Sequence, residues 1–157
     1  MLKNLKYNPN VRQKSVRKKT ASRICAIQVL YSSMLKKCSI QDSIEDYFCL
    51  YQNYILTQLE IKTIHLELFH DILSNIEINL ELIDNFISNN LSDKWKIERL
   101  SLIELCIFRL SIYELCISQK FDRKTIINEY ISMFEIFYGD VSFANAFLDN
   151  ISKKKIN

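Results

Sequence analysis

Glycine and proline are almost absent from this chain, whose 157 residues contain one of each, Gly139 and Pro9. Hairpin turns and tight strand connections draw on these two residues, so their scarcity argues against a sheet-rich fold and predicts an all-α one. Dinucleotide-binding and phosphate-binding loops need several glycines where the backbone approaches phosphate. The sequence therefore excludes both kinds of loop.

Paired cysteines, metal-ligand clusters and long apolar runs are also missing. The five cysteines form no C-x-x-C pair, which predicts packed, reduced thiols in a cytoplasmic protein. His65 and His70 lie five positions apart, about 140° round a helix, which is poor geometry for two ligands of one metal. No window is long and apolar enough to cross a bilayer. We therefore expect no metal, no cofactor and no membrane association.

Acidic residues are absent from positions 1–41, which hold ten lysines and arginines. Residues 42–152 hold eight basic and eighteen acidic residues, so a basic start precedes an acidic body. This asymmetry predicts an anionic partner at the basic end, although a charge run can also be only a solvated face. Residues 1–15 lack apolar periodicity and are expected to form a flexible basic arm, followed by one helical domain at 16–157.

A capping-box pattern, Ser101 followed by Glu104, predicts the start of a helix over residues 101–117. Its charges, Glu104, Arg109 and Glu114, fall at about 0°, 140° and 280° round the helix and share no solvated stripe. This pattern predicts a central helix packed on several sides, in which each charge needs a partner or a gap in the packing. The alternative is that the three charges only solubilise the helix.

Apolar periodicity and capping residues predict the other helices. Helices are expected over 16–35, 42–53, 57–73, 76–86 and 123–138, followed by a last helix that Ser142 caps. Asp42 and Asp122 are the expected caps of the second helix and of the helix over 123–138, and Thr57 and Glu60 form a capping box. Ser74 and Asn75 are expected to break the chain after 57–73, and Gly139 is expected to be left-handed after residue 138. Trp95 is expected to fill the joint before the central helix.

Four sequence blocks follow one another in order: a basic helix start leading into CAIQVLY at 25–31, ELCIFRLSIYEL at 104–115, IINE at 126–129 and FANAFLD at 143–149. Together they resemble the NusB family of bacterial transcription antitermination factors over about residues 17–150. The resemblance implies a single-domain bundle of about seven helices in two subbundles, without catalytic activity. It also implies binding of boxA-type single-stranded leader RNA together with NusE, a small-subunit ribosomal protein, and through them an indirect link to the RNA polymerase elongation complex in ribosomal RNA transcription.

The resemblance also assigns roles to individual residues. Those that match RNA-contacting positions of the family are Arg17, Lys18, Lys19, Arg23, Gln28, Phe137 and Phe143. Tyr31 and Glu104 match positions that face NusE. Arg109 is expected to organise the interior by pairing with an acid, for instance Glu129. Asn145 and Asp149 are expected to be structural.

The last block departs from the family pattern. Ala144 and Ala146 replace the usual valine and glycine, and Ser142 stands where a basic residue often precedes the motif. RNA contact is therefore expected more at the first helix than here.

Two other functions stay open. One is an RNA-binding domain related to those fused to ribosomal RNA cytosine methyltransferases, which the lack of a glycine-rich cofactor loop disfavours. The other is a helical adaptor that binds only protein, with the basic arm as a solvated tail.

Overall fold

The computed structural model describes residues 17–92 and 94–156, so the predicted arm at 1–15 lies outside the described residues. In this part the chain forms seven α-helices and two short helical segments, with no strand. Their bounds are α1 (Lys18–Lys36), α2 (Ile40–Leu50), α3 (Gln52–Gln58), α4 (Leu66–Asn90), the 3₁₀ helix η2 (Ile97–Arg99), α5 (Leu102–Ile112), the π-helix η3 (Tyr113–Ser118), α6 (Arg123–Ile136) and α7 (Val141–Ile151). The all-α prediction is confirmed.

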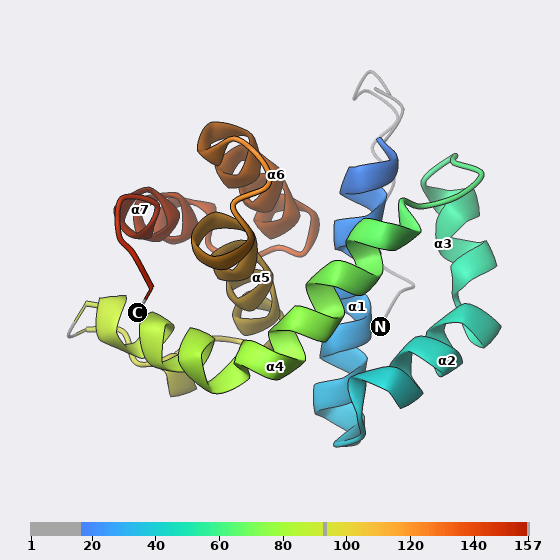
Figure 1. The fold of residues 1–157 in the computed structure, drawn as a ribbon, viewed down its shortest axis with the longest axis horizontal. Helices are drawn as coiled ribbons and strands as arrows, with labels where there is room; N and C mark the ends of the chain where they lie inside the picture. The colour runs from blue at the N-terminus through green and yellow to red at the C-terminus, as the bar shows by residue number, and fades with distance from the viewer. Residues whose placement is uncertain (1–16, 93, 157) are drawn as a thin grey trace.

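The helices form two groups joined by α4 and α5. Figure 1 shows α1, α2 and α3 on one side, α5, α6 and α7 on the other, and α4 running across both. Helix α5 contacts α1, α4 and α6, while α7 packs on α6. Within the described residues no helix is long and apolar enough to cross a membrane.

The predicted central helix is α5. The Ser101 Oγ accepts from the Glu104 backbone N–H at 3.3 Å, and a Glu104 carboxylate oxygen accepts from the Ser101 N–H at 3.0 Å, which completes the capping box. Every residue from 106 to 112 is buried. The chain then continues without a break into the π-helix η3, so one long helical rod carries the centre of the core.

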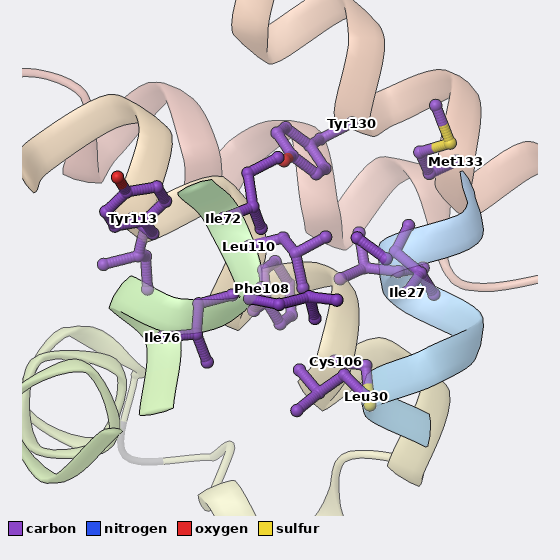
Figure 2. Packing of buried hydrophobic residues seen from close by; sticks show 14 of the residues in the cluster. Ile27, Leu30, Ile72, Ile76, Cys106, Phe108, Leu110, Tyr113, Tyr130 and Met133 are labelled. Carbon is purple, nitrogen blue, oxygen red and sulfur yellow. The ribbon is translucent and has the colours of Figure 1, made fainter. Parts of the chain in front are cut away.

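The core is built from apolar side chains of both groups. Figure 2 shows Ile27 of α1, Ile72 of α4 and Leu110 of α5 lying in one packed cluster, with Tyr130 and Met133 of α6 beside them. All five are fully buried. Burial of this kind is the main favourable term in folding, and here it holds the two helix groups together.

Two predicted helix starts are wrong. Helix α2 is capped by Ser39, whose Oγ accepts from the Asp42 N–H at 3.0 Å, so Asp42 lies in the first turn and is not the cap. Thr57 does not open a helix either, because its hydroxyl donates to the Asn53 carbonyl within α3 and Glu60 takes a left-handed φ of 55°. The next helix begins after His65, whose Nδ1 accepts from the Leu68 N–H.

The expected break at Ser74 and Asn75 is also wrong, because α4 passes through it. The Asn75 side-chain amide donates to the Asp71 carbonyl at 2.8 Å and so lies along the helix without opening it. The irregular residue is Asn79, with φ −107° and ψ 15°, whose amide donates to the Asn75 carbonyl. Such side-chain bonds to the preceding turn often bend a helix, and here they replace a break with a kink.

The end of α6 differs from the prediction in one residue. Tyr138, not Gly139, adopts the left-handed conformation, with φ 58°. The Gly139 N–H donates to the Phe134 carbonyl at 2.8 Å and the Tyr138 N–H to the Glu135 carbonyl, which is the Schellman pattern. Gly139 is needed for close approach instead, because a Cβ there would lie 2.5 Å from Cδ1 of Phe134.

Asp122 caps α6 as predicted, and its carboxylate accepts from the Thr125 N–H at 3.0 Å. The cap predicted for the last helix is wrong. Asp140 caps α7 by accepting from the Phe143 N–H at 2.9 Å, and Ser142 lies inside the first turn.

Candidate nucleic-acid interface

The start of α1 exposes three cations to solvent. Arg17, Lys18 and Lys19 are all exposed, and the first turn contains no acidic residue. The Lys19 Nζ lies 4.7 Å from the centroid of the Phe121 ring, in the loop before α6. A helix N-terminus carries partial positive charge from its free N–H groups. Cations at this end therefore add to a field that favours an anion.

Arg23, one turn further along α1, is not part of this surface. Its side chain is 3% exposed, and its Nε and Nη2 donate to the two carboxylate oxygens of Glu114 at 2.7 and 2.9 Å. Its Nη1 lies 3.1 Å from a carboxylate oxygen of Glu129. The RNA contact expected of Arg23 stays a prediction, and in this conformation all three nitrogens are directed at carboxylates inside the protein.

A buried polar network surrounds the Arg23 guanidinium. Glu114, from the π-helix η3, also accepts from the Tyr130 hydroxyl of α6, and Glu129 accepts from the Thr20 hydroxyl at 2.9 Å. Burial opposes the charge on Arg23, but hydrogen bonding and attraction from Glu114 outweigh it and raise the pKa of the guanidinium. Burial, followed by the negative charge of Glu114, raises the pKa of Tyr130. The network therefore ties the basic helix to η3 and α6.

Arg109 has a different partner from the one expected. Its Nε and Nη2 donate to the two carboxylate oxygens of Asp84, on α4, at 2.8 and 2.7 Å, and Glu129 is instead a partner of Arg23. The side chain of Arg109 is 8% exposed, and its Nη1 lies 2.9 Å from the Met34 sulfur. The pair thus joins α4 to α5. Asp84 sits in a predominantly apolar stretch of α4, which is the signal in the sequence that could have identified it.

Gln28 and Tyr31 lie further along α1 and are half-buried. The Gln28 side-chain oxygen accepts from the Tyr47 hydroxyl at 2.6 Å, so this end of the amide is used inside the protein. Tyr31 packs against the core cluster. These two residues continue the line of α1 but do not share the exposure of its basic start.

Glu104 links two helix starts. Besides closing the capping box of α5, its other carboxylate oxygen accepts from the Asp140 N–H at 3.3 Å, at the start of α7. The side chain is half-buried. A residue expected to face a protein partner therefore also fixes the position of α7 relative to α5.

The two aromatic residues expected near RNA, Phe137 and Phe143, are both half-buried against the core. The Phe143 ring stacks on Trp95 with centroids 4.3 Å apart and planes at 17°. Trp95 packs at the joint before the central helix through this stack, and 38% of it is also exposed to solvent. A tryptophan between two lysines, Lys94 and Lys96, is the signal in the sequence that could have pointed to this exposure.

Asn145 and Asp149 are exposed on α7. Asp149 pairs with Lys153 at 3.1 Å across one turn. The structural role expected of these two residues stays a prediction. Among the residues that the structure describes, no three His, Cys, Asp or Glu side chains cluster to hold a metal.

These features define an all-helical bundle whose first helix presents a basic end and is held to the second helix group by buried ion pairs. The model of the NusB family matches residues 20–153. The chain belongs to the NusB family.

Similar proteins agree with this assignment. Transcription antitermination protein NusB of Clostridium botulinum (strain Alaska E43 / Type E3) is 33% identical over 135 residues, covering 85% of this chain and 96% of that protein. The protein of the same name from Serratia proteamaculans is 31% identical over 133 residues, covering 83% and 89%. The solved structure of T. maritima NusB superposes with a TM-score of 0.68 over 88% of this chain and 92% of that one; at 23% identity it supports the fold.

Proposed function

We propose that this protein is a non-catalytic transcription antitermination factor that binds boxA-type single-stranded leader RNA together with NusE during ribosomal RNA transcription. The observation that carries the proposal is the exposed basic start of α1, Arg17, Lys18 and Lys19, in a chain of the NusB family. The relatives named above are antitermination proteins, which supports the proposal.

Two kinds of contact would contribute to RNA binding, those to phosphates and those to bases. Lysine and arginine neutralise phosphates and release counterions, which gives affinity without reading sequence. Specificity for single-stranded RNA requires contacts to unstacked bases, through aromatic faces or side-chain amides. The internal pairs of Arg23 and Arg109 hold the scaffold and leave the phosphate contacts to the three exposed cations.

The test is fluorescence anisotropy of a labelled boxA-like RNA and a scrambled RNA of equal length, with and without NusE, at two salt concentrations. We expect NusE to tighten binding of the boxA-like RNA selectively. Equal, weak binding of both RNAs regardless of NusE would reject the proposal and leave a nonspecific basic protein. Complete absence of RNA binding, with NusE still bound, would favour a protein-only adaptor.

A further inference from the structure

Trp95 is the outer member of an aromatic stack that is anchored in the core. Its indole lies against Phe143 at 4.3 Å, and Phe143 meets the fully buried Phe108 edge-on at 5.8 Å and 90°. Phe143 also lies 6.2 Å from Phe147, whose ring packs on Phe108. Trp95 covers one face of the Phe143 ring, whereas 38% of Trp95 itself is open to solvent. Trp95 therefore presents an aromatic surface at this end of the molecule.

A hollow of about 220 Å³ lies beside this indole. Its lining comes from Ser88 of α4 and from the segment that follows Trp95, residues 96–98. Lys96, which is exposed to solvent, also lines the hollow. It therefore offers a flat aromatic wall with a cation at its edge.

Three exposed cations lie close to Trp95 in the sequence. Lys94, Lys96 and Arg99 are exposed, and Glu98 is the acidic residue that lines the hollow. The Lys154 ammonium donates to the Asn90 side-chain oxygen at 2.5 Å, which brings the lysine-rich C-terminal segment to the end of α4, just before this loop. Aromatic faces interleaved with cations are the surface that single-stranded nucleic acids bind, through base stacking and phosphate neutralisation.

We propose that Trp95 forms a base-stacking subsite for single-stranded RNA, with one unstacked base on the indole and the adjacent phosphates near Lys94 and Lys96. The inference rests on the proposed function and deepens it, because it places a base contact at the opposite helix group from the basic start of α1. It also transfers the aromatic contact expected of Phe143 to Trp95, since Phe143 supports the platform. Every base has a π face, so this subsite adds affinity without choosing a sequence.

The experiment uses the fact that Trp95 is the only tryptophan of the chain. The full-length protein, alone and with NusE, is titrated with a labelled single-stranded RNA and with an abasic ribose-phosphate strand of the same length. Anisotropy of the label measures binding, and tryptophan fluorescence measures stacking; in the NusE titrations the signal of NusE with RNA alone is subtracted. We expect the RNA with bases to quench Trp95 and the abasic strand to bind without quenching.

Three variants complete the test. Trp95→Leu is expected to weaken RNA binding about fivefold to a hundredfold, the usual cost of losing one base stack. Trp95→Phe keeps a smaller ring and is expected to retain most of the affinity, which distinguishes stacking from packing. Tyr54→Leu removes an aromatic ring of similar exposure on α3, away from this stack, and is expected to bind like the wild type.

The outcomes separate the two proposals. RNA binding by the wild type with unchanged tryptophan fluorescence, or wild-type affinity in Trp95→Leu, overturns the Trp95 subsite and leaves the proposed function standing. Quenching by the abasic strand as strong as by RNA also overturns it. Absence of RNA binding by the wild type under every condition overturns the proposed function itself. Far-UV circular dichroism checks that each variant folds, and quenching of Trp95 in the wild type decides the matter if Trp95→Leu does not fold.

Discussion

Burial divides the cations of the first helix into two kinds. Lys18 and Lys19 are exposed, whereas Arg23, one turn later, is enclosed by Glu114 and Glu129. A guanidinium suits the interior position because its planar fork matches a carboxylate with two parallel hydrogen bonds, which an ammonium group cannot do. Basic residues that are close in the sequence therefore have different roles. Their burial, and not their charge, determines whether they face solvent or pair with carboxylates inside the protein.

Replacing Glu114 with alanine is expected to destabilise the protein by about 3–5 kcal/mol, because it leaves the guanidinium of Arg23 buried without its main partner. Urea unfolding followed by circular dichroism measures the change. The control is Asp46→Ala, which breaks the exposed pair with Lys36 and is expected to cost under about 1 kcal/mol. If Glu114→Ala lowers the free energy of unfolding as little as the control does, the buried network does not stabilise the fold.

Glu104→Lys is expected to abolish NusE binding while leaving the helical content of the protein unchanged, because reversing a charge at an interface opposes association. The same substitution removes the capping box of α5 and the bond to the Asp140 N–H. Ser101→Ala is the matched control, since it breaks the cap, at about 1 kcal/mol, and keeps the charge. NusE binding is measured by calorimetry; loss of binding in both variants would assign the effect to the cap, and wild-type affinity in Glu104→Lys would reject the interface.

At the scale of elements, the π-helix η3 is the feature that joins the two helix groups around the basic helix. It follows α5 without a break and is capped by Gln119, which adopts a left-handed φ of 50° and whose N–H donates to the Glu114 carbonyl. A π-turn adds a residue to the helical turn and is common at functional positions. In this protein it carries the carboxylate that receives Arg23 of α1.

The end of α6 permits two substitutions with opposite signs. Tyr138→Gly is expected to stabilise the protein by about 0.5–1 kcal/mol, because glycine adopts the left-handed conformation without the steric cost that Tyr138 bears at φ 58°. Gly139→Ala is expected to destabilise it by about 1–3 kcal/mol, because its Cβ would meet the Phe134 ring at 2.5 Å. Thermal and urea unfolding measure both; a stabilising Gly139→Ala would contradict the close packing at this turn.

At the scale of the whole molecule, charge is distributed unevenly between the start of the chain and the body. The exposed cations at the start of α1 adjoin a body in which acidic residues predominate, and many of the interior charges are neutralised in pairs. An anionic ligand is therefore attracted to one end and repelled by much of the remaining surface. Such a field orients an anionic ligand before any close contact forms.

Lys18→Ala combined with Lys19→Ala is expected to lower the affinity of the protein for all single-stranded RNAs about equally. It should lower the slope of log affinity against log salt by roughly one to two units, because each lost phosphate contact removes slightly less than one unit. Binding of boxA-like and scrambled RNA is measured across a salt series. Lys36→Ala combined with Lys37→Ala is the matched control, since it removes two exposed charges at the opposite end of the same helix. An unchanged slope in the first variant would exclude its lysines from the interface.

The sequence by itself determined the fold class and the central helix. Scarcity of glycine and proline excluded sheets, and the capping box with its scattered charges located α5, because both signals are local and act within a few residues. The order of four sequence blocks led to the family, which the comparisons confirmed. Caps at Ser39 and Asp140 were missed since several polar residues near each start are equally good caps.

Only the tertiary structure decided which residues face solvent and which charges meet. Arg23 pairs with Glu114, 91 positions away, and Arg109 with Asp84 rather than Glu129. Such pairings depend on how helices dock, and helical periodicity gives the face of a residue but not the helix that will cover it. The stack of Trp95 on Phe143 is of the same kind. Local chemistry therefore fixed the helices, while long-range packing decided which side chains stay on the surface.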